Sequence, residues 1–179
     1  MERRMKLAGF GGQGVMLVGK ILGYAASDHN KFATFLPSYG TQQRGGTAMC
    51  TVVVSDEEVG SPVVGHPDTM LIFNQASMDA YEDQIQTGGW VFMNSNAANP
   101  PKRTDLNVVA VPIDDIARDM GNRKISNLIM LGAFCEKTGL FTEEDIVHTM
   151  HHVLGGKEEL MALNEQAIKA GIAYIKEQK

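Results

Sequence analysis

The chain has 179 residues, 44% of them hydrophobic and 21% charged, and a formal net charge of −5 at pH 7; these values are typical of a globular protein whose single domain spans residues 1–179. The acidic balance disfavours nucleic acid as a partner, and no apolar run approaches the roughly 18 residues of a membrane span. The basic stretch Met1–Lys6 leads into glycines rather than a secretory h-region, so we expect a cytoplasmic protein with no membrane partner.

The predicted elements follow from hydrophobic spacing, taken in chain order. Strands are expected at residues 5–9, 32–35, 48–54, 59–64, 69–73, 90–94 and 107–111. Helices are expected at residues 13–28 and 77–86, from residue 112, and at 126–137, 142–153 and 157–176. Pro37 is expected to stop the second strand, and Pro62 indicates that 59–64 is an edge strand. Thr142 to Asp145 resembles a capping box at a helix start.

The order of these elements indicates the fold class. Strands and helices alternate over the first two thirds, which is typical of a layered α/β fold. Residues 48–64 interrupt the alternation with an expected hairpin, so the sheet is predicted to be mixed. We therefore predict a three-layer α/β fold with a mostly parallel sheet, a Rossmann-like first βα unit and a helical C-terminal part.

A glycine turn joins the first predicted strand to the first predicted helix. Gly9, Gly11 and Gly14 match the pattern G-x-G-x-x-G in its strand–turn–helix context. Such a turn places backbone N–H groups at a helix N-terminus, where an anion can bind.

Two common nucleotide sites fit this turn poorly. A P-loop needs Lys and then Ser or Thr directly after its last glycine, and here Val15 and Met16 follow. A dinucleotide fold needs an acidic residue about 20 positions on, at the end of the second strand, where this chain has Thr34 to Pro37. Two interpretations remain: a looser site for a phosphate or pyrophosphate, or a tight turn that only allows close helix–sheet packing.

The loop at residues 37–46 is a second candidate for the same site, because loops that follow parallel strands gather at one sheet edge. Arg44 offers a planar guanidinium to a phosphate or carboxylate, and Tyr39 offers a ring and a hydroxyl. The structural alternative is that Gly45 and Gly46 serve the loop's turns while Arg44 pairs with a surface acid.

The remaining reactive side chains favour structural roles. Cys50 and Cys135 lie far apart in apolar surroundings without a C-x-x-C, so we expect two buried free thiols and no four-cysteine cluster on this chain. Three histidines share helical spacing but lack a further metal ligand, and three acids lie at a helix start, where they complement the helix dipole. These histidines and acids are His148, His151, His152, Asp114, Asp115 and Asp119. We predict neither a catalytic residue nor a metal site.

The two glycine-containing segments together resemble one family, the gamma subunits of the 2-oxoacid:ferredoxin oxidoreductases. The first signature, G-x-G-G-Q-G-[VI], is matched by Gly9, Gly11, Gly12, Gln13, Gly14 and Val15. The second, Y-G-x-x-x-R-G-G, is matched by Tyr39, Gly40, Arg44, Gly45 and Gly46. Further matches are Ser55–Asp56, Gly60–Pro62, Pro67–Asp68, Asn74–Gln75, Asn127 and Leu131–Gly132. Thr41–Gln43 departs from close relatives, which leaves the 2-oxoacid open.

The resemblance implies a role within a larger enzyme. That enzyme decarboxylates a 2-oxoacid such as pyruvate, 2-oxoglutarate or ketoisovalerate on thiamine diphosphate, reduces ferredoxin through iron–sulfur clusters and forms an acyl-CoA. Thiamine diphosphate and the clusters are implied on alpha, beta or delta subunits. This chain would bind no cofactor alone and would contribute to assembly and to the coenzyme A site. A free-standing nucleotide-binding regulatory domain is the alternative.

Overall fold

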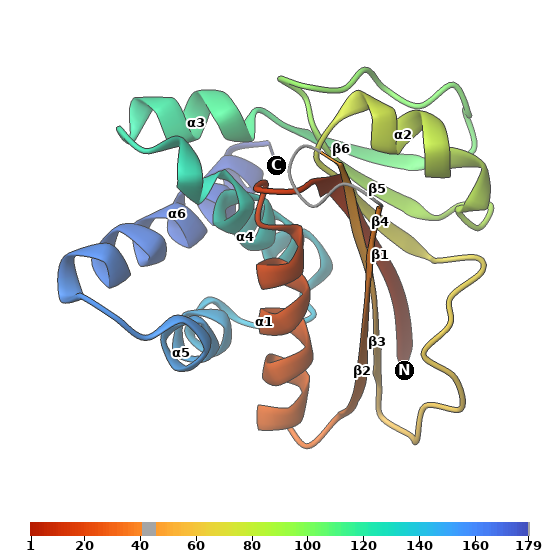
Figure 1. Ribbon diagram of the computed structural model, residues 1–179, viewed down its shortest axis with the longest axis horizontal. Helices are drawn as coiled ribbons and strands as arrows, with labels where there is room; N and C mark the ends of the chain where they lie inside the picture. The colour runs from red at the N-terminus through yellow and green to blue at the C-terminus, as the bar shows by residue number, and fades with distance from the viewer. Residues whose placement is uncertain (41–45, 179) are drawn as a thin grey trace.

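The computed structural model describes residues 1–40 and 46–178, which form a sheet with helices on both faces (Figure 1). Its strands are β1 Glu2–Phe10, β2 Phe32–Tyr39, β3 Thr47–Ser55, β4 Thr69–Ile72, β5 Trp90–Asn94 and β6 Asn107–Val111. Its α-helices are α1 Val15–Asp28, α2 Gln75–Tyr81, α3 Ile113–Asp119, α4 Ser126–Thr138, α5 Glu143–Leu154 and α6 Glu158–Glu177. Two short 3₁₀ helices, η1 Glu82–Gln84 and η2 Arg123–Ile125, follow α2 and precede α4.

The sheet is mixed and mostly parallel, as predicted. Its strand order is β2-β3-β1-β4-β5-β6. The pairs β1–β4, β4–β5 and β5–β6 are parallel, whereas β3 runs antiparallel to both of its neighbours, β1 and β2. The antiparallel part therefore comes from β3 inserted beside β1.

The predicted strand at residues 59–64 is wrong, because this segment is a loop without strand pairing. Both edges of β3 are already occupied, by β1 and by β2, so a return strand has no edge beside β3 to pair with. The loop packs against β3 instead: Thr51 Oγ1 donates to the Pro62 carbonyl at 3.2 Å, and Val64 is buried. The expected β3 hairpin is formed with β2, on the preceding side of the sequence.

The second strand also continues past the point where Pro37 was expected to stop it. Gly40 N donates to Thr47 O at 2.8 Å at the end of the β2–β3 ladder. Hydrogen-bonded pairs alternate in an antiparallel ladder, so Ser38 faces Met49 in a bonded pair and Pro37 faces Cys50 in a non-bonded one. The nitrogen of Pro37 points away from β3, and β2 lies at the sheet edge, where a proline is tolerated.

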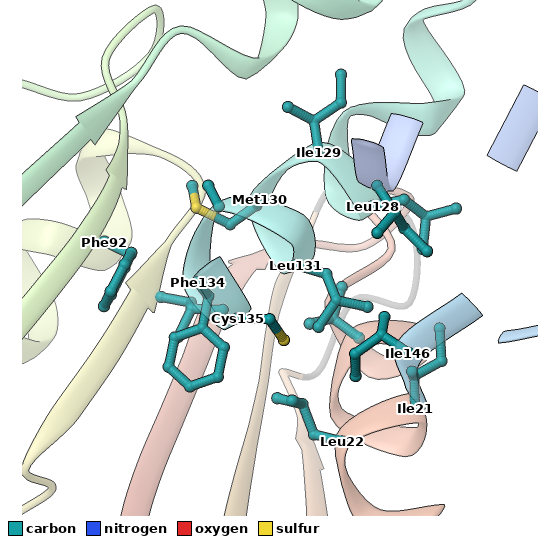
Figure 2. Packing of buried hydrophobic residues seen from close by; sticks show 14 of the residues in the cluster. Ile21, Leu22, Phe92, Leu128, Ile129, Met130, Leu131, Phe134, Cys135 and Ile146 are labelled. Atoms are coloured by element: carbon teal, nitrogen blue, oxygen red, sulfur yellow. The ribbon is translucent and has the colours of Figure 1, made fainter. Parts of the chain in front are cut away.

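The two faces of the sheet are covered by different numbers of helices. One face packs against α1 and the helical C-terminal part in the large hydrophobic cluster, in which Phe134 of α4 points toward Phe92 of β5 (Figure 2). Their ring centroids lie 5.2 Å apart in an edge-to-face arrangement. The other face carries α2 over a smaller cluster that includes Met70, Ile72 and Met78. Helices on both faces confirm the three-layer prediction.

Helix α4 is buried nearly all round because α6 packs closely against it. A Cβ at Gly132 would lie 2.1 Å from the Ile168 carbonyl oxygen, and one at Gly171 would lie 2.0 Å from that of Ile129. Glycine is therefore required at both positions. This packing fixes α4 beside α1, where Asn127, near the start of α4, reaches the glycine turn.

Candidate functional site

The glycine turn lies between β1 and α1 at the carboxyl edge of the parallel strands (Figure 1). Gly12 and Gly14 have φ angles of +97° and +75°, which favour glycine. Gly14 is the N-cap of α1, without a capping side chain, and the first turn of α1 contains no acidic residue. The first N–H groups of a helix have no intrahelical acceptor, so this end of α1 favours an anion.

Two of the glycines are also required by packing. A Cβ at Gly9 would lie 2.7 Å from Gln13 Oε1 and 3.0 Å from Phe73 Cβ. A Cβ at Gly14 would lie 2.2 Å from Asn127 Nδ2, which donates to the Gly14 carbonyl at 3.2 Å. Close packing therefore constrains Gly9 and Gly14 in addition to any contact with a ligand. Gly12 differs, since a Cβ there would meet no atom within 4 Å.

A cavity of about 300 Å³ opens beside the turn. Its lining comes from the turn, the first residues of α1 and the facing ends of β2 and β3: Phe10, Gly11, Gly12, Gly14, Val15, Met16, Tyr39, Gly46, Thr47 and Ala48. Gly11 N donates to the Gly46 carbonyl at 2.9 Å and ties the turn to the chain before β3. Tyr39 is 63% exposed at the cavity's rim.

The structure thus brings together five of the nine predicted binding residues, namely Gly11, Gly12, Gly14, Tyr39 and Gly46. Gly9 and Gln13 support the turn from beneath rather than lining the cavity. The predictions for Arg44 and Gly45 lie outside the described residues.

A network of side-chain amides holds the turn from the side of α2. Gln13 Oε1 accepts from Phe10 N at 2.7 Å and from Asn74 Nδ2 at 2.9 Å, while Asn74 Oδ1 caps α2. The Phe73 carbonyl accepts from Gln13 Nε2 and from Asn94 Nδ2, both at 3.4 Å. These groups fix the carboxyl ends of β1, β4 and β5 relative to one another.

Sequence reasoning missed this network as a unit. Asn74 directly follows the strand predicted at residues 69–73, and Asn94 ends the next strand along the chain. An amide at the end of a buried strand was the available signal, because parallel strands place their carboxyl ends at one edge. The partner of each amide was not available from spacing, since Asn127 contacts Gly14 across 113 residues of sequence.

The strand order separates the site from a dinucleotide fold. β3 lies between β1 and β2, so the end of β2 lies two strand spacings, about 10 Å, from the end of β1. Within β2 no acidic residue is available to a ribose. Both observations disfavour the NAD arrangement.

Several of the other reactive side chains contact neighbours within the chain. His151 Nε2 lies 2.5 Å from Glu165 Oε1, and the ring of His152 lies 6.0 Å from that of Tyr24. Asp114 and Asp115, in the first turn of α3, accept hydrogen bonds from Asn94, Asn96 and Arg118. The predicted place at a helix start is wrong for Asp119, which is the last residue of α3 and accepts from Arg118. Both cysteines are free and buried, as predicted, and burial raises the pKa of Cys50 to about 12.

Within residues 1–40 and 46–178, no three His, Cys, Asp or Glu side chains are grouped so that they could hold a metal ion. In the same part of the chain, no helix has the length and apolar character needed to cross a membrane.

Comparisons with known proteins identify the family. Residues 4–174 match the family model described as pyruvate ferredoxin/flavodoxin oxidoreductase. The chain is 37% identical over 177 residues to ketoisovalerate oxidoreductase subunit VorA of Methanothermobacter marburgensis, covering 98% of this chain and 37% of that protein. It is 36% identical over 150 residues to 2-oxoglutarate synthase subunit KorC of Methanocaldococcus jannaschii, covering 82% of this chain and 80% of that protein.

A solved structure agrees with these relatives. The gamma subunit of a keto/oxoacid ferredoxin oxidoreductase from Geobacter sulfurreducens superimposes with a TM-score of 0.84 at 27% identity, covering 98% of this chain and 99% of that one. The chain spans little more than a third of the length of the VorA relative. The resemblance carried by the two glycine signatures is confirmed, and the chain belongs to the pyruvate ferredoxin/flavodoxin oxidoreductase family.

Proposed function

We propose that this chain is the gamma subunit of a multi-subunit 2-oxoacid:ferredoxin oxidoreductase. The observation that carries the proposal is the family match over residues 4–174, joined by a relative of similar length that is a 2-oxoglutarate synthase subunit. The enzyme would convert a 2-oxoacid to an acyl-CoA and reduce ferredoxin. Alpha, beta and delta subunits are the proposed partners, and ferredoxin would contact the chain only through the complex.

The cavity at the glycine turn is the proposed contribution to the coenzyme A site. A phosphate group suits it, because the open N-terminal turn of α1 and the backbone of Gly12 offer N–H donors without competing side chains. The open space at Gly12 leaves the backbone accessible. Arg44, two residues before the described Gly46 in the sequence, would add a guanidinium to the same anion.

Coenzyme A is larger than this cavity. A volume of about 300 Å³ lies at the lower end of the range for small-molecule sites. The turn would therefore hold one phosphate-bearing portion, and a partner subunit would complete the site. Coenzyme A supplies the thiol that accepts the acyl group, whereas Gly11, Gly12 and Tyr39 would bind and orient it. Thiamine diphosphate and iron–sulfur clusters are proposed on the partner subunits.

Purification of the natural complex tests the subunit proposal. We expect the chain to co-elute with thiamine- and cluster-binding partners, and its deletion to abolish 2-oxoacid-dependent ferredoxin reduction. Ketoisovalerate and 2-oxoglutarate should both be assayed, because the relatives named for them match at similar identity. Elution alone, with ferredoxin reduction intact after deletion, would contradict the proposal.

A variant of Tyr39 tests the coenzyme A proposal within the assembled enzyme. Tyr39→Ala should raise the KM for coenzyme A several-fold while kcat changes less, because the exposed ring contributes to binding and not to the fold. Leu160→Ala, at a similarly exposed position of α6, is the control and should leave that KM unchanged. Micromolar binding of NAD or ATP by the isolated chain in calorimetry would favour a free-standing nucleotide-binding domain instead.

A further inference from the structure

A groove of about 470 Å³ runs beside the outer edge of β2, away from the glycine turn. Lys20, Tyr24 and Ser27 of α1 form one wall, Ala33 and Phe35 of β2 form the other, and His152 of α5 closes one end. Figure 1 shows β2 at the edge of the sheet with α1 along it and α5 beyond the lower half of α1. The groove is distinct from the cavity at Gly12 and has no residue in common with it.

The backbone along this groove has unused hydrogen-bonding groups. Since Gly40 N bonds Thr47 O, the even-numbered residues of β2 bond β3, and the odd-numbered residues point their N–H and C=O groups outward. Ala33 and Phe35 are the outward-facing residues that line the groove. Among the described residues no strand pairs with this edge, because β2 is the terminal strand of the sheet.

Proline limits the stretch of β2 that another strand could use. Pro37 is also outward-facing, and it has no N–H to donate. Pairing is therefore possible over the first half of β2, where the groove lies. The available length corresponds to a segment of about four residues, roughly 13 Å of extended chain.

The charge of the groove indicates the occupant. Its ionisable lining consists of Lys20, Tyr24 and His152, without an acidic side chain, although the chain as a whole carries a net charge of −5. Lys20 is exposed on α1. An acidic side chain of an added strand, beside Phe35 on the α1 face, would reach the ammonium group of Lys20.

Thr34 gives a second indication of a missing neighbour. Its Oγ1 is buried and has no hydrogen-bond partner among the described residues. An added strand would place a side chain directly opposite Thr34 on the same face of the sheet, within reach of a cross-strand hydrogen bond. A strand added here would thus supply partners for the backbone of Ala33 and Phe35 and for the hydroxyl of Thr34.

We propose that an extended, acidic segment of a partner subunit adds to the outer edge of β2 along Ala33–Phe35, with its acidic side chain beside Lys20. Strand addition of this kind gains its affinity from main-chain hydrogen bonds and its specificity from alternate side chains. The proposal rests on the proposed function in one respect, since the partner is a subunit of the same complex.

Hydrogen–deuterium exchange, resolved to single amides by fragmentation mass spectrometry, tests the pairing. In the isolated chain the amides of Ala33 and Phe35 should exchange quickly, whereas those of Thr34 and Leu36, bonded to β3, should exchange slowly. In the assembled complex the first two should slow by at least about tenfold. A complex that forms while Ala33 and Phe35 still exchange quickly would overturn the inference and leave the proposed function standing. A chain that joins no complex would overturn both.

A charge reversal tests the acidic occupant. Lys20→Glu should weaken assembly by about tenfold or more, and the effect should diminish as salt is raised. Lys124→Glu is the matched control, an exposed lysine in η2 outside the groove, and should change assembly by less than about twofold. Circular dichroism of both variants checks that the fold is retained. If the amides of Ala33 and Phe35 are protected in the complex but Lys20→Glu assembles as well as the unchanged chain, the proposal that the added segment is acidic is refuted.

Discussion

The carboxyl edge of the sheet and the open edge of β2 differ in whether their polar groups have hydrogen-bond partners. At the carboxyl edge, Gln13, Asn74, Asn94 and Asn127 come from four separate segments, and each bonds a neighbour within the chain. Along β2, the outward backbone of Ala33 and Phe35 and the hydroxyl of Thr34 have no partner among the described residues.

The bonded amides at the carboxyl edge indicate a preorganised site, whereas the unpaired groups along β2 indicate a surface that another chain can bind. A fully bonded amide network rigidifies its surroundings, so the turn keeps its shape before any ligand arrives. An unpaired strand edge is instead a template for another chain. The two regions are therefore expected to respond oppositely to substitution. Changes at the turn should reduce stability, whereas changes at Lys20 should affect assembly and removal of the Thr34 hydroxyl should raise stability.

The largest effect is expected at Gly14. Gly14→Ala should lower the free energy of unfolding by about 3–5 kcal/mol, because it combines a left-handed φ with displacement of the Asn127 amide. Gly12→Ala carries only the backbone strain, about 1–3 kcal/mol, since its Cβ meets open space. Urea unfolding of both variants measures the difference. Equal losses would show that the Asn127 contact contributes nothing, and the turn would then not be preorganised from α4.

The next effect is expected at Gln13. Gln13→Ala should lower the free energy of unfolding by about 2 kcal/mol, because Phe10 N and Asn74 Nδ2 both lose their acceptor. Gln86→Ala removes an exposed amide bonded to the His66 carbonyl and should cost less than about 0.5 kcal/mol. Thermal or urea unfolding compares the two. Similar small costs would mean that the amide network does not hold the turn.

A change of opposite sign is expected at Thr34. Thr34→Val should raise the free energy of unfolding of the isolated chain by about 1 kcal/mol, because it removes a buried hydroxyl that lacks a partner. Thr51→Val, on the neighbouring strand, removes a hydroxyl that donates to Pro62 and should lower stability by about the same amount. If both variants lose stability, the hydroxyl of Thr34 is satisfied in solution and the contrast between the two regions weakens.

The smallest effect concerns the start of β2. Asp56 pairs with Lys31, directly before β2, and with the Met1 ammonium. Its hydrogen bond to Lys31 is the largest cause that lowers its pKa from 3.8 to about 2. A depressed folded pKa stabilises the fold above the unfolded value, so this contribution is complete above pH 3.8 and disappears as the pH falls through about 2.

This contribution is measured by comparing the free energy of unfolding of Asp56→Asn with that of the unchanged chain from pH 6 to pH 2. The stability difference between them should shrink as the pH falls from about 4 to about 2. Glu57→Gln, at the adjacent exposed residue, is the control. A difference that does not depend on pH would mean that the Asp56 carboxylate does not anchor the start of β2 electrostatically.

The sequence by itself determined the elements whose causes are local. The spacing of Val15, Val18, Ile21 and Leu22 predicted α1, and the structure confirms it over Val15–Asp28. Thr142 and Asp145 form the predicted capping box. Helix α1, the capping box and the glycine signature are each specified by residues that lie close together in the sequence. A sequence pattern contains these residues, so it can predict the element.

Only the tertiary structure decided the strand order and the partners of the buried polar groups. Residues 59–64 have a strand-like composition, but β1 and β2 already occupy both edges of β3. Pro37 fits within β2 because its nitrogen faces away from β3, a fact that depends on register. Asn127 meets Gly14 because α6 fixes α4 beside α1. Long-range pairings compete with one another for the same edges and spaces, so no local pattern can determine which of them forms.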